Sequence, residues 1–101
     1  MAGRTMRAEL DGTILAESDA TILVEGNHYF PRESVRAEHL GPSKAVTLCY
    51  WKGIARYHSL EAGEARLPHA AWYYPQPPPW IRKIKGRIAF GPGVRVREVE
   101  G

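Results

Sequence analysis

The sequence predicts a mainly β fold (α+β, with one or two short helices) in a single domain spanning residues 1–101. With 101 residues, 44% of them hydrophobic and 25% charged, the chain has the size and composition of one globular domain. Short runs rich in branched and aromatic residues recur at regular spacing, with glycine turn signals between them. Prolines at 75, 77, 78 and 79 exclude that segment from the interior of a sheet. Together these observations favour many short antiparallel strands.

The first forty residues predict a hairpin, a strand and a helix. MRAELDGTILAES alternates apolar and polar residues and breaks at Asp11-Gly12, a pair typical of tight hairpin turns. ATILVEGNHYF is rich in branched residues and predicts one further strand, which the chain leaves at the Gly26-Asn27 pair. In PRESVRAEHLG, Pro31 near the start, Glu33 in the first turn and Gly41 after the end predict one short helix.

The segment SKAVTLCYWKGIARYHSL predicts two strands joined by a two-residue turn at Lys52-Gly53. In that register Trp51 faces Ile54 and Cys49 faces Arg56. One face would then be a core face, made of Val46, Leu48, Tyr50, Ala55 and Tyr57. The other would suit the wall of a pocket, made of Thr47, Cys49, Trp51, Ile54, Arg56 and His58. A shift of one residue would exchange these partners.

The last forty residues predict a turn at Gly63, a short strand or irregular stretch through HAAWYYP, a short helix and two final strands. The helix would begin at Pro79 in PPPWIRKIKG and end at Gly86. RIAF and VRVREVE alternate and predict strands on either side of the Gly-Pro-Gly turn at residues 91–93.

Composition argues against several classes of function. Cys49 is the only cysteine, and the four histidines have no paired spacing, so we expect no disulfide, no metal site and no cofactor. A formal net charge of +3 with interspersed signs disfavours nucleic acid as a partner. The first residues lack the apolar stretch of a secretory signal, and no run approaches the ~20 apolar residues of a membrane span. We therefore expect a cytoplasmic protein that does not bind membranes.

The aromatic segment AAWYYP is the strongest functional signal. In an extended chain Trp72 and Tyr74 lie on one side and Tyr73 on the other, so the three rings cannot all enter one core. They either complete the core or line a cleft that binds a ligand. Cys49 would be a nucleophile only with a lowered pKa, and a small buried hydrophobic role is favoured, with slow reaction of its thiol. The candidate ligand-binding residues are His28, Tyr29, Cys49, Trp51, Lys52, Arg56, Trp72, Tyr73 and Tyr74.

Four segments, VEGNHYFPRESV, CYWKGIARYHS, AAWYYPQP and IKGRIAFG, together resemble a bacterial family known as domain of unknown function 427. The resemblance covers about Leu10 to Phe90. It implies a single curved antiparallel β domain similar to the β-tent group, which includes the Mss4-like and methionine sulfoxide reductase B folds. Members of that group often hold zinc with two Cys-x-x-Cys pairs, and the sequence has none. The family also carries a nucleotidyltransferase-like label.

Three functions follow from these observations. The first is binding of a small molecule in an aromatic-lined cleft, with or without a reaction. The second is nucleotidyl transfer with Lys52 and Arg56 holding phosphates, which needs paired carboxylates for magnesium. The acidic residues are instead scattered, with no Asp-x-Asp: Asp11, Glu17, Asp19, Glu25, Glu33, Glu38, Glu61 and Glu64 among them. The third is a protein-interaction module that uses the Pro-rich aromatic loop.

Overall fold

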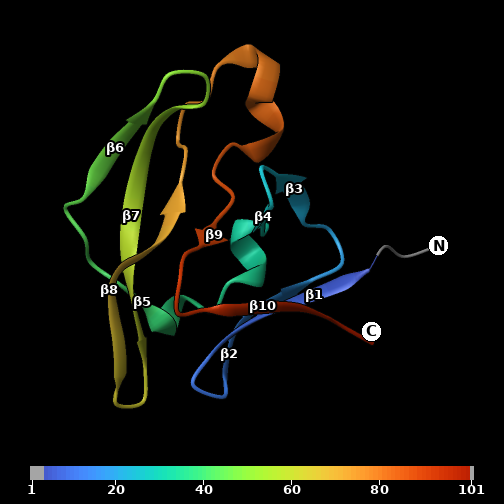
Figure 1. Ribbon diagram of the computed structural model, residues 1–101, viewed down its shortest axis with the longest axis vertical. Helices are drawn as coiled ribbons and strands as arrows, with labels where there is room; N and C mark the ends of the chain where they lie inside the picture. Colours follow the sequence, from blue (N-terminus) through green and yellow to red (C-terminus); the bar gives the residue numbers. More distant parts are fainter. Residues whose placement is uncertain (1–3, 101) are drawn as a thin grey trace.

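The computed structural model describes residues 4–100 and confirms a mainly antiparallel β fold (Figure 1). Its strands are β1 (Thr5–Leu10), β2 (Thr13–Ser18), β3 (Ile22–Val24), β4 (Asn27–Tyr29), β5 (Leu40–Gly41), β6 (Val46–Cys49), β7 (Gly53–Ala62), β8 (Ala65–Tyr73), β9 (Ala89–Phe90) and β10 (Arg95–Val99). Its helices are all 3-10 helices: η1 (Arg32–Ser34), η2 (Ala37–His39) and η3 (Pro79–Ile84). Among the residues described, none of these helices has the length and hydropathy to cross a bilayer.

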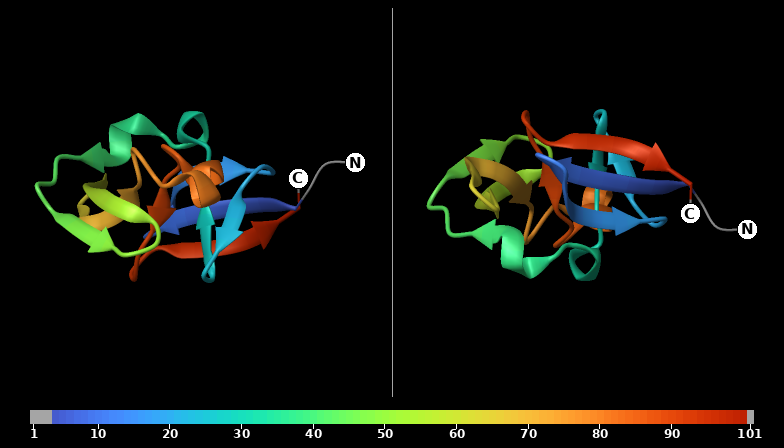
Figure 2. Two further views of the ribbon diagram at one scale, coloured as in Figure 1. Left: turned by 90° about the horizontal axis from the view of Figure 1, so that it is seen from above. Right: turned by 90° about the horizontal axis from the view of Figure 1, so that it is seen from below.

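The strands form three antiparallel sheets. A three-stranded sheet has the order β10-β1-β2, and a separate hairpin pairs β3 with β4. A five-stranded sheet has the order β5-β7-β8-β9. Its fifth strand, β6, pairs with the first residues of β7, whereas β5 pairs with residues further along β7. Seen from either end, the five-stranded and three-stranded sheets occupy opposite sides of the molecule (Figure 2). The helix η3 and the β6–β7 turn lie together at one end of its long axis (Figure 1).

Two tight turns shape the first thirty residues. Asp11 and Gly12 have φ angles of 52° and 83°, the left-handed pair that a type I′ hairpin turn requires, so the predicted β1–β2 hairpin is confirmed. Glu25 and Gly26 have the same conformation, with φ angles of 54° and 81°. The predicted strand before the Gly26-Asn27 pair forms as β3, but the chain reverses at Glu25-Gly26 and pairs Val24 with Asn27, so a second strand, β4, follows that the sequence did not predict.

The predicted helix over residues 31–40 is wrong. The segment forms two single 3-10 turns, η1 and η2, separated by extended backbone at Val35 and Arg36. Val35 forms a β-bridge with Ala16, and the Arg36 N–H donates to the Leu15 carbonyl over 2.8 Å. Pairing with β2 thus uses the backbone at the position where a continuous helix would need it.

The β6–β7 hairpin has a different register from the predicted one. The turn contains three residues rather than two, so Cys49 pairs with Gly53, Leu48 with Ile54, and Val46 with Arg56. The predicted pairings of Cys49 with Arg56 and Trp51 with Ile54 are therefore wrong. The predicted core face is wrong as well, because Val46, Leu48 and Tyr50 are 52%, 78% and 95% exposed. Of that set, Ala55 is fully buried, and the half-buried Tyr57 forms a hydrogen bond with Thr47 on the same face.

The C-terminal elements agree better with the sequence. The short helix η3 starts at Pro79, is kinked at Ile81 and buries Ile81 and Ile84. The stretch after Gly63 is a nine-residue strand, β8, whose register with β7 shifts midway. The last two strands exist, but they do not pair with each other: β9 pairs with β8, and β10 pairs with β1. The segment between them carries the chain from one sheet to the other.

The apolar side chains form two clusters on either side of the five-stranded sheet. The first lies against the three-stranded sheet and includes Leu15, Leu60, Ile88 and an edge-to-face pair of Phe30 and Phe90 rings 5.5 Å apart. The second lies beneath η3 and the β3–β4 hairpin, and its buried members are Val24, Tyr29, Ala55, Tyr74, Ile81, Ile84 and Ala89. At the end of β8, Tyr73 packs against the first cluster and Trp72 and Tyr74 against the second, which places the aromatic segment at the junction between them.

Candidate functional site

The three consecutive aromatic residues alternate as the sequence predicts. Tyr73 packs against the first cluster, where its ring stacks on His58 at a centroid distance of 5.2 Å. Trp72 and Tyr74 pack in the second cluster. Tyr74 is almost fully buried and lies 6.4 Å from the Tyr29 ring. The Trp72 indole N–H donates to the Tyr29 hydroxyl over 3.2 Å, which fixes the orientation of the indole.

Several candidate residues gather in a closed arrangement around Lys52. This Lys52 cluster consists of Tyr29, Cys49, Trp51, Lys52 and Tyr74, together with Glu25. Lys52 is only 7% exposed, and its ammonium forms an ion pair with the Glu25 carboxylate. The ammonium also lies 5.4 Å from the ring centroids of Trp51 and Tyr74, within the range of a cation–π interaction. These contacts tie the β3–β4 turn to the β6–β7 turn.

The electrostatics keep this pair ionised at neutral pH. Burial by itself lowers the pKa of Lys52, but the hydrogen bond to Glu25 opposes it, and the net result is a pKa above the ordinary value. The same hydrogen bond lowers the pKa of Glu25. Lys52 therefore carries its proton and has no lone pair for nucleophilic attack or for general-base catalysis. Its ammonium is occupied by Glu25 and by two aromatic rings rather than presented to a ligand.

Trp72 and His28, by contrast, line an open cavity of about 510 Å³, which we call the Trp72 cavity. Its apolar walls come from β1, β9, β10 and the loop between the last two strands: Met6, Phe90, Pro92, Val94 and Val96. Gly26, Asn27 and Gly91 complete the lining. A side chain at Gly91 would begin 3.3 Å from the Trp72 ring and 3.4 Å from the Ala70 carbonyl oxygen, so glycine lets the chain pass closely over the indole.

His28 stands between this cavity and a second hollow of about 390 Å³. The second hollow is lined by Met6 and His28 from the shared wall, and otherwise by Arg4, Asp19, Thr21, Leu23 and Glu98. The His28 Nδ1 lies 3.0 Å from the Thr21 hydroxyl. This contact orients the ring and leaves Nε2 as the nitrogen available to a ligand.

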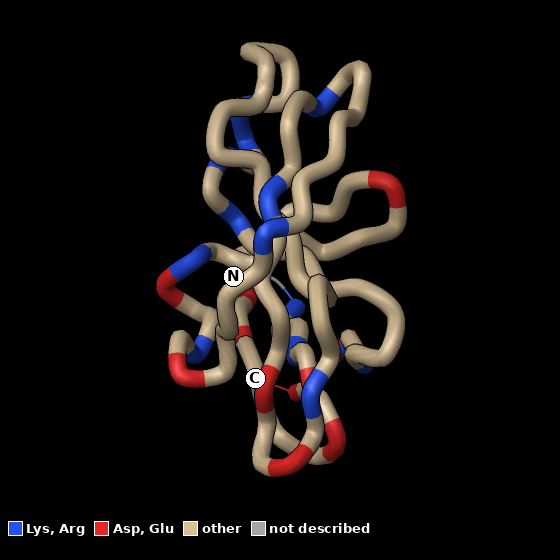
Figure 3. Tube along the Cα trace, turned by 90° about the vertical axis from the view of Figure 1, so that its left-hand side faces the viewer, with Lys and Arg blue, Asp and Glu red and all other residues tan. Residues whose placement is uncertain are grey.

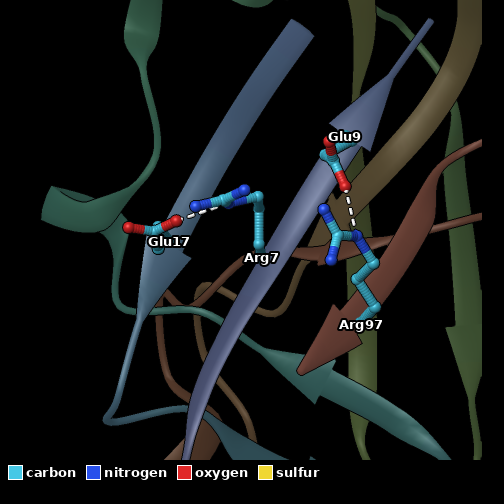
Figure 4. A network of polar contacts seen from close by, with 4 residues as sticks. All are labelled: Arg7, Glu9, Glu17 and Arg97. Carbon is cyan, nitrogen blue, oxygen red and sulfur yellow. Dashed lines mark hydrogen bonds and ion pairs between the residues drawn. The ribbon is translucent and has the colours of Figure 1, made fainter. Parts of the chain in front are cut away.

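The sheet that carries one wall of the cavity is fastened on its outer face by cross-strand ion pairs (Figure 4). Arg7 on β1 donates to Glu17 on β2 over 2.5 Å, and Arg97 on β10 donates to Glu9 on β1 over 2.7 Å. The hydrogen bond from Arg97 lowers the pKa of Glu9. Because side chains alternate along a strand, these charges lie on one face of the sheet, and Ala8 and Leu10 on the other face enter the core.

The remaining candidates lie elsewhere. Arg56 is exposed and lines a separate hollow of about 480 Å³ with Gly53, Ile54, Pro75 and Gln76. Cys49 is half-buried and packs against the second cluster. The nine candidates thus divide among the Lys52 cluster, the Trp72 cavity, the Arg56 hollow and the first core cluster, which holds Tyr73.

Sequence reasoning missed two parts of this arrangement. The first is the wall supplied by β1 and β10, whose only signal is the alternation that puts Val94 and Val96 on one face. The second is Glu25, because nothing in the sequence indicates that a turn residue will reach a lysine 27 positions later. Within residues 4–100 no group of three His, Cys, Asp or Glu side chains is placed to hold a metal ion.

Comparisons with known proteins agree with the resemblance noted in the sequence. A search of curated proteins found no match to the chain. A family model described as a domain of unknown function (DUF427) matches residues 1–100, which extends beyond the segment carrying the recognised motifs. The chain therefore belongs to the DUF427 family.

Proposed function

We propose that this protein binds a small, uncharged and largely apolar molecule in the Trp72 cavity. The observation that carries the proposal is the composition of the lining, which combines apolar side chains with the Trp72 ring and contains no Lys, Arg, Asp or Glu. Its volume of about 510 Å³ lies in the range of ligand pockets, roughly 300–1,000 Å³. Ligand pockets are typically apolar, with a few polar groups that fix orientation.

The lining suggests how such a ligand would be held. Because the Trp72 N–H is already bonded to Tyr29, the indole offers apolar ring surface rather than a hydrogen bond. Asn27 and His28 are the lining residues with hydrogen-bonding side chains besides Trp72. These features favour a flat molecule with an apolar body and one or two hydrogen-bonding groups.

Nucleotidyl transfer has less support. A nucleoside triphosphate needs cations for its phosphates and carboxylates for magnesium. Lys52 is buried and paired with Glu25, and Arg56 lies on the outward face of β7, in a different hollow. Lys52 and Arg56, the two residues expected to hold the phosphates, therefore do not face a common site.

The binding proposal is tested by NMR titration of the 15N-labelled protein with indole, nicotinamide and adenosine as probes. We expect at least one probe to shift amide signals of β4, Gly91 and β10 in a saturable way. Val96→Phe, which fills the cavity, should abolish these shifts. The matched control is Trp80→Phe, because Trp80 is 69% exposed and lies outside the cavity lining. Shifts that map elsewhere, or that survive Val96→Phe, would contradict the proposal.

A second candidate function, binding of a partner protein, is favoured by an apolar edge. Val46, Leu48 and Ile54 are 52%, 78% and 50% exposed, and their backbone pairing places them on one face of the β6–β7 hairpin. The Arg56 hollow, whose wall includes the Pro-rich loop, adjoins this face. Among the strands described, β6 pairs only with β7, so its other edge is open to a further strand. We call these three side chains with the open edge the β6 surface.

The charge around the β6 surface indicates the kind of partner. The half of the molecule that carries η3 and the β6–β7 turn shows Lys and Arg with little Asp or Glu, whereas the other half holds most of the Asp and Glu, mixed with Lys and Arg (Figure 3). Arg56 and Lys44 flank the exposed apolar residues. We therefore infer that the partner is an extended segment with alternating apolar and acidic residues, which pairs with β6 as an additional strand of the sheet.

A fluorescence-anisotropy titration tests this candidate with a labelled Val-Glu repeat peptide, and with a Val-Lys repeat as its charge-reversed control. We expect the acidic peptide alone to bind, and Leu48→Asp to abolish binding. Leu23→Asp is the control, because Leu23 is equally an exposed leucine, 59% accessible, but lies on β3. Equal binding of both peptides would contradict the proposal. Self-association of the protein that is lost in Leu48→Asp would also contradict it, by assigning the surface to a second copy.

A further inference from the structure

We propose that the protein has a phosphate-binding site, separate from the Trp72 cavity, where the segment entering η1 meets the segment leaving η3. A pocket of about 260 Å³ lies there, lined by Pro31, Arg32, Glu33, Lys85, Gly86 and Arg87. We call it the Arg32 pocket. It shares none of its lining residues with the Trp72 cavity or the Arg56 hollow.

The fold brings the two sides of this pocket together from distant parts of the sequence. Phe30 and Ile88 exchange two backbone hydrogen bonds of 2.8 and 2.9 Å, which places the residues after Phe30 beside those before Ile88. The Gly86 N–H donates to the Tyr74 carbonyl over 3.1 Å, and Gly86 adopts a φ of 70°, which glycine tolerates without strain. The backbone on both sides of the pocket is therefore fixed by regular hydrogen bonds.

The two arginine side chains are held in place before any ligand arrives. Arg32 donates from Nε to the Gly86 carbonyl over 3.3 Å, and its guanidinium carbon lies 4.8 Å from the Tyr73 ring centroid. Arg87 donates to the carbonyls of Lys83 and Ala20 over 3.1 and 2.9 Å. Side chains fixed in this way lose little further freedom when they bind a ligand.

The charge of these arginines is not neutralised by their partners. Each is anchored by backbone carbonyls or by an aromatic ring rather than by a carboxylate. None of the ion pairs found within residues 4–100 includes Arg32, Lys85 or Arg87. The remaining guanidinium N–H groups are thus available as charged donors, the groups that bind phosphate oxygens most strongly.

The balance of charge selects the ligand class. Three cationic side chains and the single carboxylate of Glu33 give the pocket a formal surplus of two positive charges. A phosphate monoester carries close to two negative charges at neutral pH, whereas a phosphate diester or a carboxylate carries one. The pocket, at about 260 Å³, has room for a phosphate group together with part of its substituent. The ligand class is a terminal phosphate monoester.

Isothermal titration calorimetry at low ionic strength tests the proposal, with methyl phosphate, dimethyl phosphate and acetate as probes. We expect methyl phosphate to bind at least about tenfold more tightly than either monoanion. Lys85→Gln should weaken binding of methyl phosphate severalfold without disturbing the fold, because the Lys85 side chain is exposed. Glu33→Gln should strengthen binding. The matched control is Arg66→Gln on β8, an exposed arginine outside the pocket, which should leave binding unchanged.

A second pair of measurements separates the site from general charge attraction. Arg87→Lys keeps the charge but loses the paired carbonyl contacts, and it should weaken methyl phosphate binding more than Arg66→Gln does. Amide shifts on titration should map to residues 31–33 and 85–87. Equal affinity for methyl phosphate and dimethyl phosphate would overturn the proposal. So would the absence of any effect of Glu33→Gln, or loss of binding in Arg66→Gln equal to that in Lys85→Gln.

Discussion

Replacing Tyr74 by alanine should remove a large part of the stability of this protein. Tyr74 is 5% exposed, and it packs on Tyr29 and the apolar residues beneath η3. A buried aromatic side chain removes about 150–250 Å² from water, which at about 25 cal/mol per Å² corresponds to roughly 4–6 kcal/mol. This figure is an upper estimate, because denatured chains already bury some apolar surface. Truncation of buried rings typically costs about 3–5 kcal/mol, the value that we expect here.

That loss is large for a chain of 101 residues, whose free energy of unfolding should be about 5–15 kcal/mol. Since about 1 kcal/mol shifts Tm by roughly 4–8 °C in a domain of this size, a loss of about 3–5 kcal/mol should lower the Tm of Tyr74→Ala by about 12–40 °C. Tyr74→Phe keeps the ring and should cost less than about 1.5 kcal/mol. The assay is thermal unfolding followed by circular dichroism, together with urea unfolding to obtain the free energy.

Trp72→Ala is the informative comparison. The Trp72 ring is half-buried and borders an existing cavity, so removing it extends a space that water already reaches rather than creating a sealed void. We expect a cost of about 2–3 kcal/mol for Trp72→Ala, smaller than for Tyr74→Ala. If both variants lost the same large stability, and probe binding to the Trp72 cavity were unchanged, the assignment of Trp72 to a binding site would be refuted.

Three further predictions concern ionisable and reactive groups. Lys52→Met should change the free energy of unfolding by less than about 1.5 kcal/mol, whereas Glu25→Gln, which leaves the buried ammonium without its anion, should destabilise the protein more in the same urea assay. Burial, opposed by a backbone hydrogen bond with Gly41, lowers the pKa of His58, so the unfolded chain binds this proton more readily. Its contribution to stability should be complete above pH about 6.5 and be lost as pH falls toward the folded-state pKa, and His58→Gln should flatten this part of a Tm–pH profile. Cys49 should react with a thiol reagent far more slowly in the native protein than after unfolding, because its side chain packs against the second cluster, and native labelling at the unfolded rate would contradict this.

The sequence alone was sufficient for local features whose cause lies within a few residues. Asp11-Gly12 specifies a type I′ turn because its two residues tolerate positive φ, and Pro79 starts a short helix because its own φ is already helical. The alternation of Trp72, Tyr73 and Tyr74 follows from the geometry of an extended chain and holds in the structure. The family motifs were likewise visible in short segments of sequence.

Tertiary structure decided the features that depend on distant partners. The helix predicted after Pro31 does not form, because Val35 and Arg36 pair with β2, a strand about twenty residues earlier. One additional turn residue changed the β6–β7 register, and this turned Val46 and Leu48 outward. The separation of the aromatic candidates into a closed Lys52 cluster and an open Trp72 cavity depends on the contact of Lys52 with Glu25 and on the pairing of β1 with β10. Both contacts join segments far apart in the chain, and a sequence pattern records the periodicity of each segment but not which other segment it will meet.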